Sequence, residues 1–210
     1  MNIARLGSGL LLALFLTYPS IGHSYYSTLD TGEILKEGNY RVTGGAQAIT
    51  SEDTGVNVTG RFDHWLNEEM EIQGLAGFGV VDFQAGAFLK WVPIPDYEKQ
   101  PAVGLKAGVL YGSVEGESEL TFRIHPMISK KFETEIGKVS PFAALPLGMR
   151  FKDSKVSVPT QIVGGGFYEH PDLENVRFAV ELGFDLNKAF NYITLGVQLA
   201  IDDEEGIQIR

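Results

Sequence analysis

The sequence predicts an all-β protein, an antiparallel up-and-down transmembrane β-barrel of about ten strands with a range of roughly 8 to 12. Three observations lead to this prediction. Large apolar residues recur at every second position over strand-length segments, with charged, polar or very small residues between them. Clusters of turn residues separate these segments, and the chain begins with an export signal. Because successive side chains on a strand point to opposite faces, each segment would have one apolar and one polar face.

Residues 1–24 have the pattern of a cleaved signal peptide. Arg5 supplies a positive charge, residues 10–16 form a short apolar run, and small residues then allow cleavage after Gly22 or Ser24. The run is far shorter than the roughly 20 apolar residues that a membrane-spanning helix needs. We therefore expect the protein to be exported.

Composition excludes several classes of function. The 210 residues suit one domain, and 17 Lys and Arg against 27 Asp and Glu give a net charge of −10. Such an acidic balance argues against nucleic-acid binding, which is usually marked by a basic patch. The chain contains no cysteine, which excludes disulfides and thiol chemistry. No spacing of histidines supports a metal site, and we expect no cofactor.

The barrel is predicted to occupy residues 39–203, after a polar lead-in at residues 25–38 that we expect on the periplasmic side. Strands follow from the alternation and their ends from turn residues. The apolar phase shifts at residues 79–82, and because a phase change moves side chains to the other face, we expect a tight turn there. The strands expected in this half are residues 39–50, 56–63, 70–78, 83–91 and 103–111.

The second half continues the pattern but has proline inside two of its segments. Because proline cannot donate to a strand ladder, we expect segments 139–151 and 156–168, which contain Pro141, Pro146 and Pro159, to be bulged or interrupted. No segment of ten or more residues after the signal has sustained helical periodicity, so βαβ folds are unsupported. The other strands expected here are residues 120–128, 176–186 and 193–201, and residues 204–210 form a C-terminal tail.

The polar faces indicate which solvent the apolar faces meet. A soluble sandwich would have a polar face poor in glycine, whereas here charged residues mix with small ones, as in Gly104, Lys106 and Gly108. In a narrow barrel long charged side chains pair across the interior, and glycines leave room for them. Unpaired ions there are costly, so we predict a network of salt bridges and hydrogen bonds. Its expected members are Arg61, Glu71, Lys90, Lys106, Glu119, Arg123, His125, Arg177, Glu181 and Asp185.

Aromatic residues are found near strand ends and turns, where membrane barrels have interfacial girdles. The alternative, ordinary core and turn aromatics of a soluble β-protein, stays open because alternation alone does not identify the solvent. The predicted girdle consists of Phe62, Trp65, Phe78, Trp91, Tyr97, Tyr111, Phe132, Phe151, Tyr168, Phe190 and Tyr192.

The signal peptide, the strand–turn unit at residues 61–74 and the glycine-spaced strands resemble the small outer-membrane β-barrel proteins of Gram-negative bacteria. The resemblance covers nearly all of residues 39–203 and specifies an architecture rather than an activity or a subfamily. It implies a location in the cell outer membrane, contact with outer-membrane lipid, and assembly by the barrel-insertion machinery with periplasmic chaperones. Such barrels usually finish on a terminal aromatic, whereas the last strand expected here ends near Ile201.

This architecture leads us to expect a non-enzymatic protein with a structural or narrow-pore role. Eight-stranded barrels are filled by their side chains and wider ones open progressively, so about ten strands lies near that threshold. One alternative is a lipid-modifying hydrolase or acyltransferase, because His125, Ser129 and Glu119 share the polar face. Another is a soluble periplasmic barrel or sandwich that binds a small apolar ligand. The sequence does not indicate the oligomeric state.

Overall fold

The computed structural model describes residues 27–51, 54–114, 116–173 and 175–202. The predicted signal peptide and the C-terminal tail lie outside the described residues. Every regular element in the described ranges is a β-strand. Those ranges also hold no helix of the length and apolarity that crossing a membrane requires.

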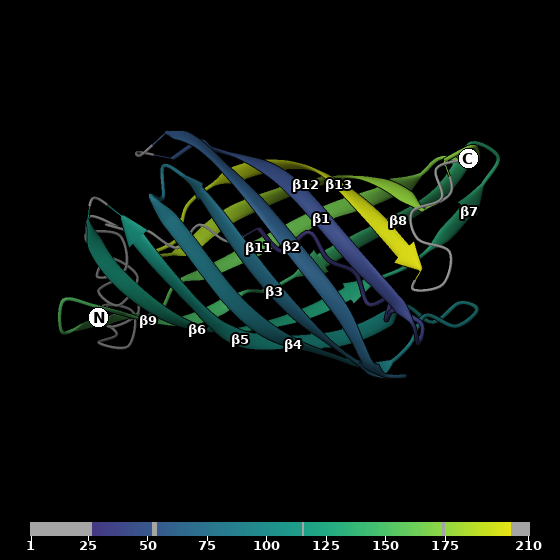
Figure 1. Cartoon of the computed structure of the whole chain (residues 1–210), viewed down its shortest axis with the longest axis horizontal. Coiled ribbons are helices and arrows are strands. Elements are labelled where there is room, and N and C mark those ends of the chain that lie inside the picture. Colours follow the sequence, from purple (N-terminus) through teal and green to yellow (C-terminus); the bar gives the residue numbers. More distant parts are fainter. Residues whose placement is uncertain (1–26, 52–53, 115, 174, 203–210) are drawn as a thin grey trace, which may run out of the picture.

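Ten antiparallel strands close into a barrel, which confirms the predicted fold class (Figure 1). Neighbours in the ring follow the chain order, and β1 pairs with β13 to close it. A closed barrel leaves no strand edge exposed. Nine ring positions are filled by β1 (Asn39–Ile49), β2 (Gly55–Asn67), β3 (Met70–Gly79), β4 (Phe83–Ile94), β5 (Ala102–Val114), β6 (Glu117–Ser129), β11 (Thr160–Glu169), β12 (Val176–Asn187) and β13 (Tyr192–Asp202).

The remaining ring position, between β6 and β11, is filled by two strands in succession. Both β8 and β9 pair with β6 and with β11. The break between them includes Pro146, and Pro159 lies between β10 and β11, so the two proline-bearing segments are interrupted as predicted. The shorter strands are β7 (Phe132–Thr134), β8 (Gly137–Ala144), β9 (Leu147–Lys152) and β10 (Lys155–Ser157).

The two ends of the barrel differ in what lies there. Because neighbouring strands are antiparallel, β1 begins and β13 ends at the same end, which we call the mouth. The turns that follow β1, β3, β5, β9 and β12 lie at the opposite end, which we call the far rim.

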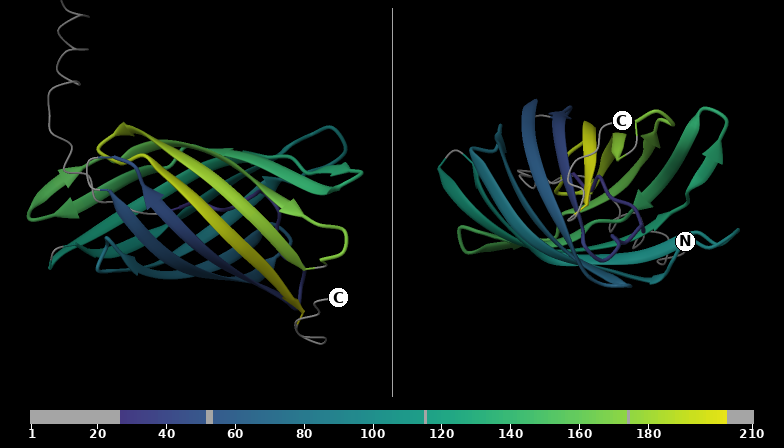
Figure 2. Two further views of the ribbon diagram at one scale, coloured as in Figure 1. Left: turned by 90° about the horizontal axis from the view of Figure 1, so that it is seen from above. Right: turned by 45° about the vertical axis from the view of Figure 1, so that its right-hand side comes forward.

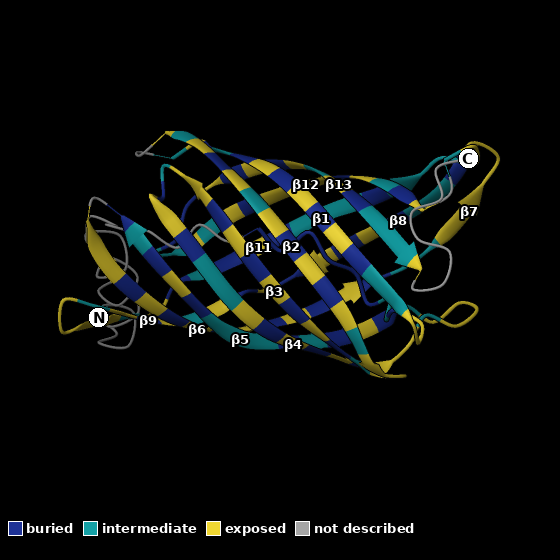
Figure 3. Cartoon of the chain, viewed as in Figure 1, coloured by how far each residue is buried: buried dark blue, intermediate teal, exposed yellow. Residues whose placement is uncertain are grey.

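Buried and exposed residues alternate along the strands (Figure 3), so successive side chains face the lumen and the outer surface in turn. In β6, Phe122 and Ile124 are 52% and 49% exposed, whereas Thr121 and Arg123 between and beside them are 1% and 2% exposed. The nine uninterrupted strands have 10 to 13 residues. A tilted strand crosses a bilayer with about 9–11 residues, so their length fits an apolar slab.

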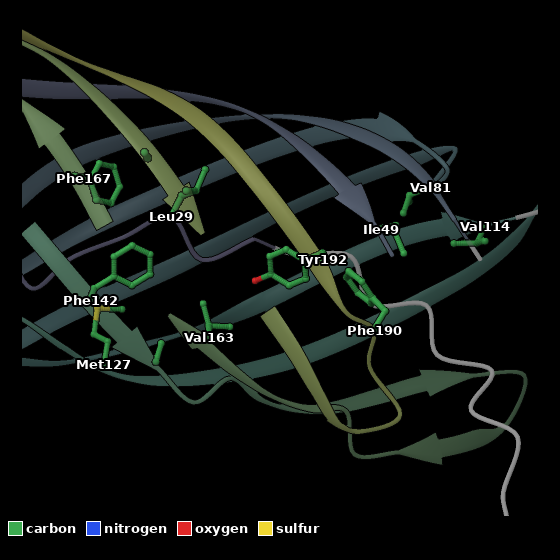
Figure 4. Close-up of a cluster of buried hydrophobic side chains, with 12 residues drawn as sticks. Leu29, Ile49, Val81, Val114, Met127, Phe142, Val163, Phe167, Phe190 and Tyr192 are labelled. Carbon is green, nitrogen blue, oxygen red and sulfur yellow. The ribbon is translucent and has the colours of Figure 1, made fainter. Parts of the chain in front are cut away.

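The interior contains more apolar surface than the expected polar lumen. Met127, Phe142 and Phe167 belong to one contiguous cluster of buried apolar side chains inside the barrel (Figure 4). The same cluster reaches the far rim through Ile49, Val81, Val114 and Phe190. The far rim is therefore partly lined by apolar groups, while the buried charges around residues 27–38 lie deeper in the lumen.

Two residues predicted for the aromatic girdle, Phe190 and Tyr192, point into the lumen, so that part of the prediction is wrong. They are 2% and 3% exposed, and their ring centroids lie 5.4 Å apart. Ile193 begins the outward-facing series of β13, and alternation then directs Tyr192 inward. Its ring occupies the space over Gly183, where an added Cβ would lie 2.0 Å from Tyr192 Cε1.

We expect Gly183→Ala to lower the free energy of unfolding by about 1–3 kcal/mol, because the new methyl group displaces the Tyr192 ring. Gly74→Ala is the matched control, since Gly74 lies in mid-strand with no atom within 4 Å of an added Cβ. Urea titration of the heat-modifiable gel band measures both variants. Equal losses of unfolding free energy in the two variants would contradict the close packing of the Tyr192 ring against Gly183.

Candidate functional site: a lumen filled by residues 27–38

Residues 27–38, which we call the inner segment, run through the lumen and lead into β1 at the mouth (Figures 1 and 2). The sequence predicts a lead-in at residues 25–38, and its described part lies inside the barrel (Figures 1 and 2); its periplasmic location stays a prediction. Ser27 to Thr31 are all buried. Side chains of β2, β3, β4, β5, β6 and β12 hold it by hydrogen bonds. The inner segment is thus a plug supplied by the chain itself.

The Asp30 carboxylate is the centre of the contacts between the plug and the barrel wall. Its Oδ1 accepts a hydrogen bond from Lys90 Nζ at 2.9 Å, and its Oδ2 accepts one from Lys106 Nζ at 3.2 Å. Gln73 Nε2 donates to Oδ2 at 2.8 Å, and Arg61 NH1 lies 3.9 Å away. All of these side chains are buried. A buried carboxylate is tolerated only with such charged and hydrogen-bonding partners.

Two carboxylates of the wall balance the cations that surround the plug. Arg61 donates from Nε and NH2 to the two oxygens of Asp63, at 2.7 and 3.1 Å, which is a bidentate pair. Lys90 Nζ donates to Glu71 Oε1 at 2.9 Å, and Arg41 NH1 lies 3.7 Å from Asp63 and 3.6 Å from Glu71. Arg61 NH1 also donates to two backbone carbonyls of the inner segment, at 2.9 and 3.0 Å. The wall therefore binds the plug by its backbone as well as by Asp30.

Glu181 on β12 binds the beginning of the inner segment. Its carboxylate accepts hydrogen bonds from Ser27 Oγ and the Thr28 N–H, both at 2.8 Å, and from the Leu29 N–H. Tyr192 Oη donates to the same carboxylate at 2.7 Å. This explains why Tyr192 points inward: its hydroxyl helps to satisfy a buried carboxylate.

At the mouth, Glu33 of the inner segment forms ion pairs with two cations of the barrel. Lys131 Nζ lies 2.9 Å from Glu33 Oε1, and Arg177 NH1 contacts Oε2. Arg177 Nε also pairs with Glu169 at 3.1 Å. Burial raises the pKa of Glu33, but the charges of Arg177 and Lys131 outweigh it and lower the pKa from 4.5 to about 2. These residues line an open cavity of about 780 Å³.

The half of the lumen toward the far rim contains uncharged polar side chains. Among the described residues, buried side-chain atoms there have no protein hydrogen-bond partner, on Gln47, Gln84, Thr121, Gln161 and Thr194. This half of the lumen is therefore lined by buried polar side chains in addition to the apolar groups of the far rim.

Eight of the ten predicted network residues lie on the lumen face and are buried. Arg177 lies at the mouth, half-buried. Asp185 is half-buried near the end of β12 at the far rim, where its Oδ1 accepts the Ala189 N–H at 3.0 Å. The eight are Arg61, Glu71, Lys90, Lys106, Glu119, Arg123, His125 and Glu181.

Several charged residues of the site were missed from the sequence. Asp63 has the same two-residue phase as Arg61, so the rule that selected Arg61 would also have found it. Arg150 is buried on β9, where the neighbouring prolines obscured the phase. Asp30 and Glu33 lie in a stretch without periodicity, and no pattern signals that they enter the lumen.

Most of the predicted girdle lies on the outer surface. Trp65 is an exception, because it pairs with the inward-facing Glu71 and so shares its face. Trp91 Nε1 donates to Glu69 at 3.0 Å, as expected of an aromatic residue with one apolar and one polar side. The residues with exposed side chains are Phe62, Phe78, Trp91, Tyr97, Tyr111, Phe132 and Phe151, and Tyr168 is half-buried.

The residues considered for catalysis do not come together. His125, Ser129 and Glu119 are all on β6. With a rise of about 3.3 Å per residue, Ser129 lies about 13 Å from His125 along the strand, and Glu119 lies about 20 Å from His125 in the other direction. Ser129 Oγ accepts the Gly32 N–H of the plug at 2.8 Å. Within the described ranges there is also no group of His, Asp and Glu residues suited to hold a metal ion.

No family model matches the chain, and no curated protein matches it. Among solved structures, an outer membrane channel from Pseudomonas putida F1 aligns with a TM-score of 0.53 at 10% identity, covering 81% of this chain and 98% of that one. The β domain of the Bordetella autotransporter BrkA gives 0.47 at 9% identity, covering 78% and 98%. A de novo designed transmembrane β-barrel gives 0.41 at 13%, covering 80% and 100%.

These likenesses concern the fold alone. The fold is that of the outer-membrane β-barrels, which confirms the resemblance found in the sequence.

We expect Glu33 to make the barrel sensitive to acid only at low pH. Because its pKa is lowered from 4.5 to about 2, its contribution to stability is complete above about pH 5 and is lost as the pH falls through 2. The loss of free energy of unfolding between about pH 5 and 2 should be smaller in Glu33→Gln than in the native chain. Urea titrations at each pH measure it, with exposed Glu135→Gln as control. Identical pH profiles for Glu33→Gln and the native chain would contradict the assignment.

Proposed function

We propose that this chain is an integral outer-membrane protein, exported with a cleaved signal peptide, whose lumen is a narrow polar pore closed by its own residues 27–38. Its function is to let small solutes pass through the lumen, and it does not catalyse a reaction. Outer-membrane lipid surrounds it, and the barrel-insertion machinery with periplasmic chaperones assembles it.

The outer surface supports a membrane location. Large apolar side chains are exposed on all the long strands, as with Phe62, Phe122 and Phe184. Soluble monomers rarely expose contiguous apolar patches beyond a few hundred Å², and this surface encircles the barrel. That observation favours lipid over the soluble ligand-binding alternative.

The plug is the observation that favours a pore function over a purely structural role. A barrel that only needed filling could be closed by its own inward side chains, as eight-stranded barrels are. Here the filling is a separate segment joined to the wall through polar contacts centred on Asp30, beside a mouth that is open and a far half that is polar. Polar contacts of this kind can be exchanged for water and ions.

A disulfide between the plug and the wall tests the proposal. An added Cβ at Gly32 would lie 3.3 Å from Ser129 Oγ, so Gly32→Cys with Ser129→Cys would approach disulfide spacing. The same Cβ would lie 2.5 Å from Ala102 Cβ, which Ala102→Gly relieves. The chain has no other cysteine. In a planar bilayer we expect the oxidised protein to be silent and the reduced protein to give stepwise currents, more often when Asp30→Asn weakens the plug.

Two controls make the result decisive. Single-cysteine variants should not respond to reductant. A Val81→Ser, Val114→Ser background widens and wets the apolar far rim, which could otherwise act as a second constriction. Equal currents with the plug locked and free would contradict the plug, and silence of the reduced Asp30→Asn protein in both backgrounds would leave a structural barrel as the function.

A further inference from the structure

We propose that the positions occupied by Asp30 and Glu33 are anion-binding sites of the lumen, and that the opened pore selects small anions such as chloride and short monocarboxylates. The anion selectivity rests on the proposed pore. The two anion-binding sites do not depend on whether the barrel conducts.

The central site is defined by two lysines directly opposite each other. Lys90 on β4 and Lys106 on β5 are cross-strand partners, and both are fully buried. Like charges directly opposite on neighbouring strands destabilise a sheet. The Asp30 carboxylate resolves this conflict by giving one oxygen to each lysine, at 2.9 and 3.2 Å. The pair is therefore arranged to hold a carboxylate, and the plug provides one.

A second site of the same kind lies at the mouth. Lys131 and Arg177 come from separate parts of the barrel and meet on the two oxygens of Glu33. Glu33 follows Asp30 by three residues, so two carboxylates of the plug occupy two cationic positions in succession. The mouth position lines the open cavity, whereas the central position at Asp30 is fully buried inside the lumen.

Cations continue past the plug toward the far rim. Lys106 is opposite His125 on β6, Arg123 lies two residues further along β6, and Arg150 is opposite Thr121, two residues further again. Two residues of a strand span about 7 Å. Buried cationic side chains thus follow one wall of the lumen at short intervals.

The balance of buried charge on the strands is positive although the whole chain has a net charge of −10. Six buried cations face four buried carboxylates once the plug is set aside. A narrow passage lined by excess positive charge favours anions. The cations are Arg41, Arg61, Lys90, Lys106, Arg123 and Arg150, and the carboxylates are Asp63, Glu71, Glu119 and Glu181.

Rescue by a small carboxylate tests the central site without any current. Asp30→Ala removes the carboxylate and leaves space between Lys90 and Lys106. We expect sodium formate to raise the urea midpoint of this variant saturably, relative to the same ionic strength of sodium gluconate, and to leave the native chain unchanged. The rescue should be lost in Asp30→Ala, Lys106→Gln. Equal effects of formate and gluconate, or full rescue without Lys106, would overturn the site.

The reversal potential in a potassium chloride gradient tests selectivity, with the reduced cysteine variant carrying Asp30→Asn. We expect the sign set by chloride, and a shift toward potassium in Lys90→Gln and Lys106→Gln. Lys155→Gln, on the exposed β10, is the control and should cause no shift. A potential of the potassium sign, or one that Lys106→Gln leaves unchanged, would overturn anion selectivity. Absence of any current refutes the pore instead, and the formate measurement still decides the site.

Discussion

The carboxylate of Asp30 between Lys90 and Lys106 is the contact on which the rest of the lumen depends. Two buried lysines on adjacent strands repel each other, and a carboxylate within hydrogen-bonding distance of both stabilises their burial. Glu71 serves Lys90 from the wall, but the oxygen that reaches Lys106 comes from the plug. The inner segment therefore completes the charge pairing of the barrel wall at these two lysines.

The barrel could be predicted from the sequence because alternation is a local property. The outward-facing residues of β6 and the inward-facing Arg61 follow from the two-residue alternation alone. Pro146 indicates the break between β8 and β9. The prediction for Tyr192 is wrong because it rests on the position of this residue near a turn. The alternation beside the outward-facing Ile193 indicates the inward direction. Asp30 could not be found at all, since what buries it is the closure of strands distant in sequence. The two-residue periodicity predicts the strands of the barrel wall, but it does not predict a segment without periodicity that crosses the interior.

In the proposed function, the plug and the cationic wall correspond to a closed state of the pore. Buried ion pairs hold the inner segment together with the buried Leu29 side chain, so opening requires that water and ions take the place of these charged partners. The acidic outer regions of the chain and its cationic lumen are separate features with separate roles. The first sets the net charge, and the second sets what the interior binds.

A double-mutant cycle between Asp30 and Lys106 tests the central claim most directly. Free energies of unfolding are measured by urea titration for the native chain, Asp30→Asn, Lys106→Gln and the double variant. Removing one partner of a buried ion pair costs about 3–5 kcal/mol, so Asp30→Asn should be strongly destabilising alone and much less so once Lys106 is also replaced. Additive losses, within about 0.5 kcal/mol, would show that the two side chains do not interact and would contradict the account.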